Sequence, residues 1–120
     1  MDFDRLKAIL KRAQDTYGYK NQMSVVAEEC CELGKECNKY VRYPNHEVAE
    51  RELRDKILTE VADMIICLNH LYMMFDINPE ECEKHVEVKL DRLERWLDSS
   101  SDMYQTTIDR EVEEVEFKKL

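Results

Sequence analysis

The chain contains little of what a sheet protein needs. Only two glycines and two prolines occur in its 120 residues, so it has few of the residues that tight turns require. The abundant residues are Leu, Met, Glu, Lys and Arg, which all favour helices. A chain of this length supports one modest core rather than two. The composition therefore predicts a single all-α domain.

The chain also lacks a disulfide framework. The five cysteines form an odd set in which Cys30 and Cys31 are adjacent. Such spacing indicates free thiols in a reducing compartment. The sequence has no signal-peptide pattern, and its longest apolar run is short and interrupted by charges, which argues against a bilayer span. We expect a cytoplasmic protein that does not enter a membrane.

Positive charge is scarce. The sequence has 27 acidic and 18 basic residues, for a formal net charge of −9, and no strong basic block is visible. Such a surface repels nucleic acid polymers and anionic membranes. A free nucleotide remains compatible with it, because a divalent cation can join acidic side chains to phosphates.

Four helices follow from the apolar spacing and from the breaks between segments. Asn78 is suited to an N-cap and Pro79 to a first helical position. The highly charged segment 46–56 is either a loop or the exposed start of the third helix. The predicted helices cover about residues 3–16, 22–41, 53–75 and 79–97.

The expected architecture is a bundle-like domain of four helices over residues 1–98. Ser99, Ser100 and Ser101 then mark a linker. Residues 102–120 are acidic and weakly patterned, so segment 99–120 is predicted to be a linker followed by an acidic C-terminal tail or arm.

Two carboxylates interrupt the most apolar stretch of the chain. Glu60 and Asp63 lie within ILTEVADMIICLNHLYMMF, residues 57–75. Burying an unpaired carboxylate costs several kcal/mol, so such groups are normally paired, protonated or bound to a metal. Their spacing of three residues places them on one face of a helix. We therefore expect this face to point inward and to hold a cation.

A second acidic cluster lies upstream. At roughly 100° per residue, four glutamates share one arc of about 100° on a helix: Glu28, Glu29, Glu32 and Glu36. The opposite side is predicted to be the apolar one, and it carries Val26, Cys30, Leu33 and Cys37.

Other interpretations of the acidic residues remain open at this point. A solvated acidic face explains the upstream cluster, although it does not explain Glu60 and Asp63. A ferritin-like di-iron bundle requires Glu-x-x-His pairs, which neither cluster supplies. Oxygen ligands without an accompanying His or Cys favour Mg²⁺, or Mn²⁺, over zinc.

These motifs resemble those of a known family. Glu28-Glu29-Cys30-Cys31-Glu32 is similar to the EExxE motif, and Glu60-Val61-Ala62-Asp63 to the ExxD motif, of the MazG-like nucleotide pyrophosphohydrolases. These belong to the all-α NTP pyrophosphatase superfamily. The resemblance covers about residues 17–97 and includes the helix that starts at Asn-Pro-Glu-Glu.

The resemblance implies an activity and a set of ligands. The activity is a Mg²⁺-dependent cut between the α- and β-phosphates of a nucleoside triphosphate, which yields a monophosphate and pyrophosphate. By motif position, Glu28 would orient or deprotonate the attacking water. The metal ligands would be Glu29, Glu32, Glu60 and Asp63.

The resemblance also implies phosphate contacts from the fourth helix. Lys89 matches the expected lysine, whereas Leu93 stands where the family has an asparagine. Arg92 and Lys84 are alternative phosphate-binding residues. Gln22 is a further substrate-binding candidate, near the place of a polar family residue.

Because of Leu93, a second function stays open, namely a non-catalytic helical module of the same fold that binds a nucleotide or a protein. In either case the family resemblance and the broad apolar surface predict association. We expect a homodimer or a homotetramer.

Overall fold

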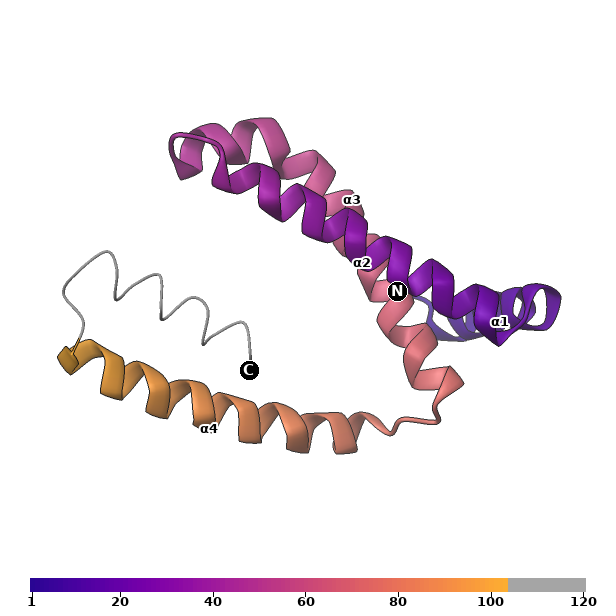
Figure 1. Cartoon of the computed structure of the whole chain (residues 1–120). Helices are drawn as coiled ribbons and strands as arrows, with labels where there is room; N and C mark the ends of the chain where they lie inside the picture. Colours follow the sequence, from indigo (N-terminus) through magenta and orange to yellow (C-terminus); the bar gives the residue numbers. More distant parts are fainter. Residues whose placement is uncertain (104–120) are drawn as a thin grey trace. The chain divides into compact units, whose positions relative to one another are not determined.

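The computed structural model describes residues 1–103, with side chains as far as residue 99, and these residues form helices without any strand (Figure 1). The all-α prediction is thus confirmed for them. Residues 1–77 and the segment that begins at Asn78 form two compact units. The four helices are α1 (Phe3–Tyr17), α2 (Tyr19–Val41), α3 (His46–Met74) and α4 (Pro79–Met103). The predicted tail over residues 104–120 lies outside the described residues.

Local capping explains where α1 and α3 begin. The backbone N–H of Arg5 donates to Asp2 Oδ1 at 3.0 Å, and that of Val48 donates to Asn45 Oδ1 at 3.0 Å. Both side chains satisfy an amide that the helix itself leaves without a partner. Gly18 separates α1 from α2 with a φ of 85°, which glycine adopts without steric cost. Because Asn45 caps it, α3 starts at His46, so segment 46–56 is the start of the helix.

The fourth helix begins as predicted and ends later than predicted. The N–H of Glu80 donates to Asn78 Oδ1 at 2.9 Å, and the N–H of Asn78 donates to Glu81 Oε2 at 3.0 Å. This reciprocal pair is a capping box. The helix continues to Met103, past the serines where we predicted a linker. Ser99 Oγ donates to the carbonyl of Trp96 at 3.0 Å, a bond that accommodates serine within a helix.

In the first unit, α2 and α3 run antiparallel along much of their length, and α1 packs against both (Figure 1). Glu29 of α2 lies beside Glu60 and Asp63 of α3, so the middle of α2 faces this part of α3. Among the described residues only five hydrophobic side chains are buried: Leu10, Val26, Ala49, Leu53 and Cys67.

Polar residues occupy nearly as much of this interior as apolar ones. Four polar or charged side chains are buried in the described part of the chain: Gln22, Glu36, Glu60 and His70. A core of this kind gains little from the hydrophobic effect and costs desolvation at every polar group. The first unit therefore has few apolar contacts of its own to stabilise it.

The inward face of α2 differs from the predicted one. Cys30 and Cys37 were expected in the core, but both are exposed. Glu36 is instead buried and Glu29 half-buried. The predicted acidic arc is thus divided, because α3 packs on the edge that carries Glu29 and Glu36. Glu28 and Glu32 stay on the exposed flank.

The outward face of α3 is apolar as well. Its large hydrophobic side chains are between 40% and 56% exposed, and they are Leu58, Val61, Ile65, Ile66 and Leu68. By length and composition, α3 is long and apolar enough to cross a membrane. From the sequence we expected no segment of this kind. A core helix of a soluble protein can meet the same two criteria. Glu60 and Asp63, within the helix, would be costly in lipid.

His70 makes the first unit sensitive to acid. Burial lowers the pKa of His70 from its usual 6.5, because the imidazolium would lose its hydration. Below about pH 6.5 the unfolded chain takes up a proton that the folded chain does not. The free energy of unfolding therefore decreases as the pH is lowered through this range. We expect a smaller decrease in the free energy of unfolding for the variant His70→Gln.

Urea midpoints of both proteins at about pH 7.5 and about pH 5.5 measure this difference. The comparison with the variant matters because carboxylate groups also titrate towards the lower pH. Equal pH dependence of the two proteins would contradict the assignment to His70.

Candidate metal centre

Three carboxylates from two helices converge in the first unit. Glu29 comes from α2, and Glu60 and Asp63 come from α3. One oxygen of each lies within 4.8 Å of the others. The convergence follows from the antiparallel packing of α2 on α3, since Glu60 and Asp63 are three residues apart and share a helix face. All three are among the four metal ligands that the family resemblance implies, and the fourth is Glu32.

The proximity of these groups alters the acidity of Glu29. The pKa of Glu29 is raised above its usual value of 4.5, first by desolvation and then by the charge of Asp63 and a hydrogen bond with it. Glu60 and Glu32 raise it further by like-charge repulsion. Ionisation of Glu29 is therefore disfavoured beside these groups, and a bound cation would relieve the repulsion.

Glu60 is the most deeply buried member of the three. Its residue is only 4% exposed, and Oε2 is buried without a hydrogen-bond partner. Oε1 lies 3.5 Å from the ammonium of Lys56. A buried carboxylate oxygen without a partner is costly. Together with the two neighbouring carboxylates, it forms a set that fits a divalent cation.

The nearby thiol does not change this oxygen-only set. Desolvation raises the pKa of Cys67, and the charge of Glu29 raises it further. Its sulfur is not one of the ligand atoms that converge in the three-carboxylate group. Oxygen ligands without sulfur or imidazole suit Mg²⁺ or Mn²⁺ better than zinc.

The other two residues of the first motif lie at the edge of the cluster. Glu32 is exposed and stands outside the 4.8 Å group, although its charge contributes to the raised pKa of Glu29. Glu28 is exposed on the neighbouring side of α2. The structure thus brings together three of the four predicted metal ligands and leaves the predicted catalytic carboxylate on the solvent side.

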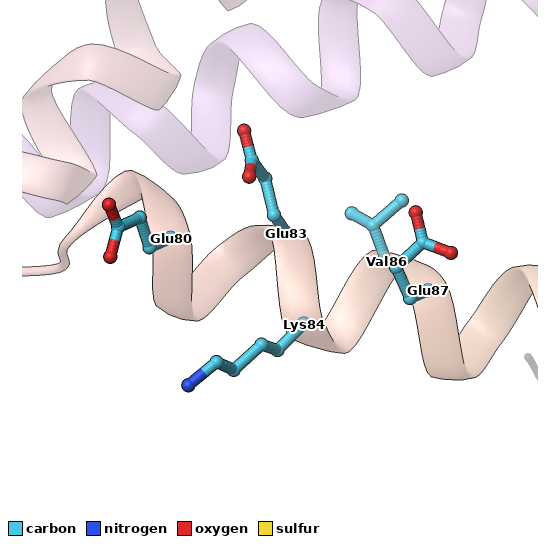
Figure 2. Close-up of a pocket in the computed structure, with 5 residues that line it drawn as sticks. All are labelled: Glu80, Glu83, Lys84, Val86 and Glu87. Atoms are coloured by element: carbon cyan, nitrogen blue, oxygen red, sulfur yellow. The ribbon is translucent and has the colours of Figure 1, made fainter.

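The predicted phosphate-binding residues belong to the second unit. Lys84, Lys89 and Arg92 are exposed on α4, whereas the carboxylate cluster lies in the first unit. Figure 2 shows a pocket along α4 in which the ammonium of Lys84 points away from the side that carries most of the acidic groups. The pocket is lined by Glu80, Glu83, Lys84, Val86 and Glu87. Its acidic character does not suit a phosphate.

Gln22, which we predicted as a substrate-binding residue, is buried rather than exposed. Its side chain is buried, and Nε2 donates to Asn21 Oδ1 at 3.1 Å. In this conformation the amide nitrogen is paired with a neighbouring side chain.

Sequence reasoning missed two charged residues near this region. Lys56 lies four residues before Glu60, a spacing at which opposite charges meet on a helix, and this signal was available from the sequence. Glu36 is only 1% exposed and pairs with Lys39 at 3.1 Å. Its burial was not foreseeable, because it depends on how α2 is rotated against α3.

The arrangement would place a hard cation between α2 and α3. The buried Glu60 and the half-buried Glu29 and Asp63 would hold it on the protein side. The comparisons with known proteins identify no relative, since no protein family model, no curated protein and no solved structure matches the chain.

Proposed function

We propose that the protein is a Mg²⁺-dependent nucleoside triphosphate pyrophosphohydrolase, with Mn²⁺ as an alternative metal. It would cut between the α- and β-phosphates and release a monophosphate and pyrophosphate. The observation that carries this proposal is the cluster of Glu29, Glu60 and Asp63, whose oxygens lie within 4.8 Å of one another. The EExxE and ExxD motifs supply the remaining support.

Each carboxylate has a role that its position suggests. Glu60, Asp63 and Glu29 would hold the cation, and Glu32 would approach it from the exposed edge. When bound, a divalent cation neutralises phosphate charge and lowers the pKa of a water molecule. Glu28 is exposed beside this set, so its carboxylate could orient the attacking water and accept its proton.

Recognition of the nucleotide would use groups outside the cluster. By the family resemblance, Lys89 would contact the phosphates, with Arg92 and Lys84 as alternatives, and all three are exposed on α4. Tyr17 and Tyr19 are exposed on either side of Gly18, and aromatic rings of this kind stack on bases.

The outward face of α3 supports association with a second copy of the chain. Leu58, Val61, Ile65, Leu68 and Tyr72 repeat at alternating intervals of three and four residues, as at helix–helix seams. The first and last members lie seven residues on either side of Ile65, so two copies of α3 could pair antiparallel about a two-fold axis near Ile65.

An antiparallel pair centred on Ile65 would use the outward face of α3. Such a pairing would cover apolar surface that a monomer leaves in water. A homodimer built in this way would place two carboxylate clusters in one particle, and a homotetramer would need a further surface.

Metal binding should stabilise the protein measurably. Millimolar Mg²⁺ or Mn²⁺ should raise the melting temperature by about 5 °C, because the cation relieves repulsion among the three carboxylates. EDTA should reverse the increase. Differential scanning fluorimetry with added MgCl₂, MnCl₂ or CaCl₂ measures the effect.

A buried glutamate outside the cluster provides the control. Glu60→Gln should abolish the metal-dependent increase. Glu36→Gln also changes a buried carboxylate of this unit, but it should retain the increase even if its basal stability changes. A metal response that persists in Glu60→Gln would exclude the proposed site.

Turnover provides the direct test of the reaction. With a panel of ribo- and deoxyribonucleoside triphosphates and Mg²⁺, we expect monophosphate and pyrophosphate as products. Glu60→Gln and Asp63→Asn should each reduce the rate by at least about 100-fold, with unchanged helical content by circular dichroism.

Anion-exchange chromatography separates these products from diphosphate and phosphate. Metal binding without turnover of any nucleotide would instead favour the non-catalytic nucleotide- or protein-binding module. Full activity in both variants would contradict the assignment of the site.

The association is tested by light scattering coupled to size exclusion. The wild-type protein should elute as a dimer or tetramer at micromolar concentration, and Ile65→Glu should reduce the mass, because it places a charge at the centre of the seam. Lys11→Glu, on an exposed part of α1, is the control and should not change the mass. A monomeric wild-type protein would contradict the prediction.

A further inference from the structure

Lys56 brings a positive charge into contact with the carboxylate cluster. Its ammonium lies 3.5 Å from Glu60 Oε1. The other carboxylate oxygen, Oε2, has no hydrogen-bond partner among the described residues. The Glu60 side chain is 5% exposed, whereas that of Lys56 is 54% exposed. The negative partner is therefore fixed in the interior, and the positive partner is free to move into solvent.

A second lysine–glutamate pair in the same unit shows what is particular about this contact. Lys39 lies closer to the buried Glu36, at 3.1 Å, and is itself less exposed, at 38%. Glu36 is not part of the three-carboxylate group. The contact of Lys56 with Glu60 is thus longer and more exposed than that of Lys39 with Glu36. Only Glu60 belongs to the three-carboxylate group.

Charge balance gives Lys56 two alternative partners. One ammonium compensates only part of the negative charge that Glu29, Glu60 and Asp63 carry when ionised. A divalent cation among the same oxygens would compensate more of it and would repel the ammonium. The flexible four-carbon stem of a half-exposed lysine allows the charge to move without a change in the helix.

We propose that Lys56 is an exchangeable cation of this site, which holds Glu60 in the metal-free protein and moves to the phosphate chain of the substrate when a divalent cation binds. The inference rests on the proposed function, because it takes the carboxylate cluster as the metal site. It assigns to α3 a phosphate contact of the kind that we otherwise expect from α4.

Two titrations test the two halves of this proposal. The first measures Mn²⁺ binding to the metal-free protein by calorimetry. Lys56→Met should bind Mn²⁺ about 3- to 10-fold more tightly than the wild type, because a competing cation is removed. The second measures binding of the manganese–tripolyphosphate complex, which should weaken about 3- to 10-fold in the same variant.

Two further variants separate charge from other effects. Lys56→Arg keeps the positive charge and should retain wild-type affinity for the phosphate complex within about 2-fold. Lys11→Met removes the same charge from an exposed pair with Asp15, and it should change neither affinity. Circular dichroism confirms that each variant keeps its helices.

The outcomes distinguish this inference from the proposed function. A wild-type protein that binds no Mn²⁺ would overturn the metal site and the proposed function with it. Wild-type binding with an unchanged Mn²⁺ affinity in Lys56→Met would overturn the exchange alone. Unchanged affinity for the phosphate complex in that variant would overturn the phosphate contact.

Discussion

The packing of α2 against α3 places carboxylates in an interior where water cannot fully solvate them, and the first unit is organised around this constraint. Glu29, Glu60 and Asp63 meet within 4.8 Å, and Glu36 is buried on the same face of α2. Each carboxylate has a desolvation cost that a cation can offset. Lys39 and Lys56 supply part of that positive charge. Stability and the proposed metal affinity would therefore depend on the same groups.

The polar interior also accounts for the unusual surface of α3. On its inward face, Glu60 and His70 are buried. On its outward face, Leu58, Ile65 and Leu68 are partly exposed. A helix that is apolar on its outward side requires a second apolar surface to cover it. Association through this face would add the burial that the interior lacks. Binding chemistry and self-association would then be linked through one helix.

Much of the fold was predictable because it depends on local rules. Asn78 and Glu81 form the capping box that the Asn-Pro-Glu-Glu sequence indicates, and the few glycines and prolines leave the helices uninterrupted. The start of α3 was harder to predict, because segment 46–56 is charged and its helicity follows from the cap at Asn45. The end of α4 was placed too early, since a run of serines can remain helical when a hydroxyl bonds to the backbone.

The sequence by itself determined the helical class, the helix starts set by caps, and the spacing that puts Glu60 and Asp63 on one face. Tertiary structure decided which side of α2 meets that face, and so turned Glu29 and Glu36 inward while Cys30 and Cys37 stayed exposed. A helical wheel gives the angles between residues but not the rotation of one helix against another. That rotation depends on the packing of both partners along their whole length, which is a property of the pair rather than of either sequence.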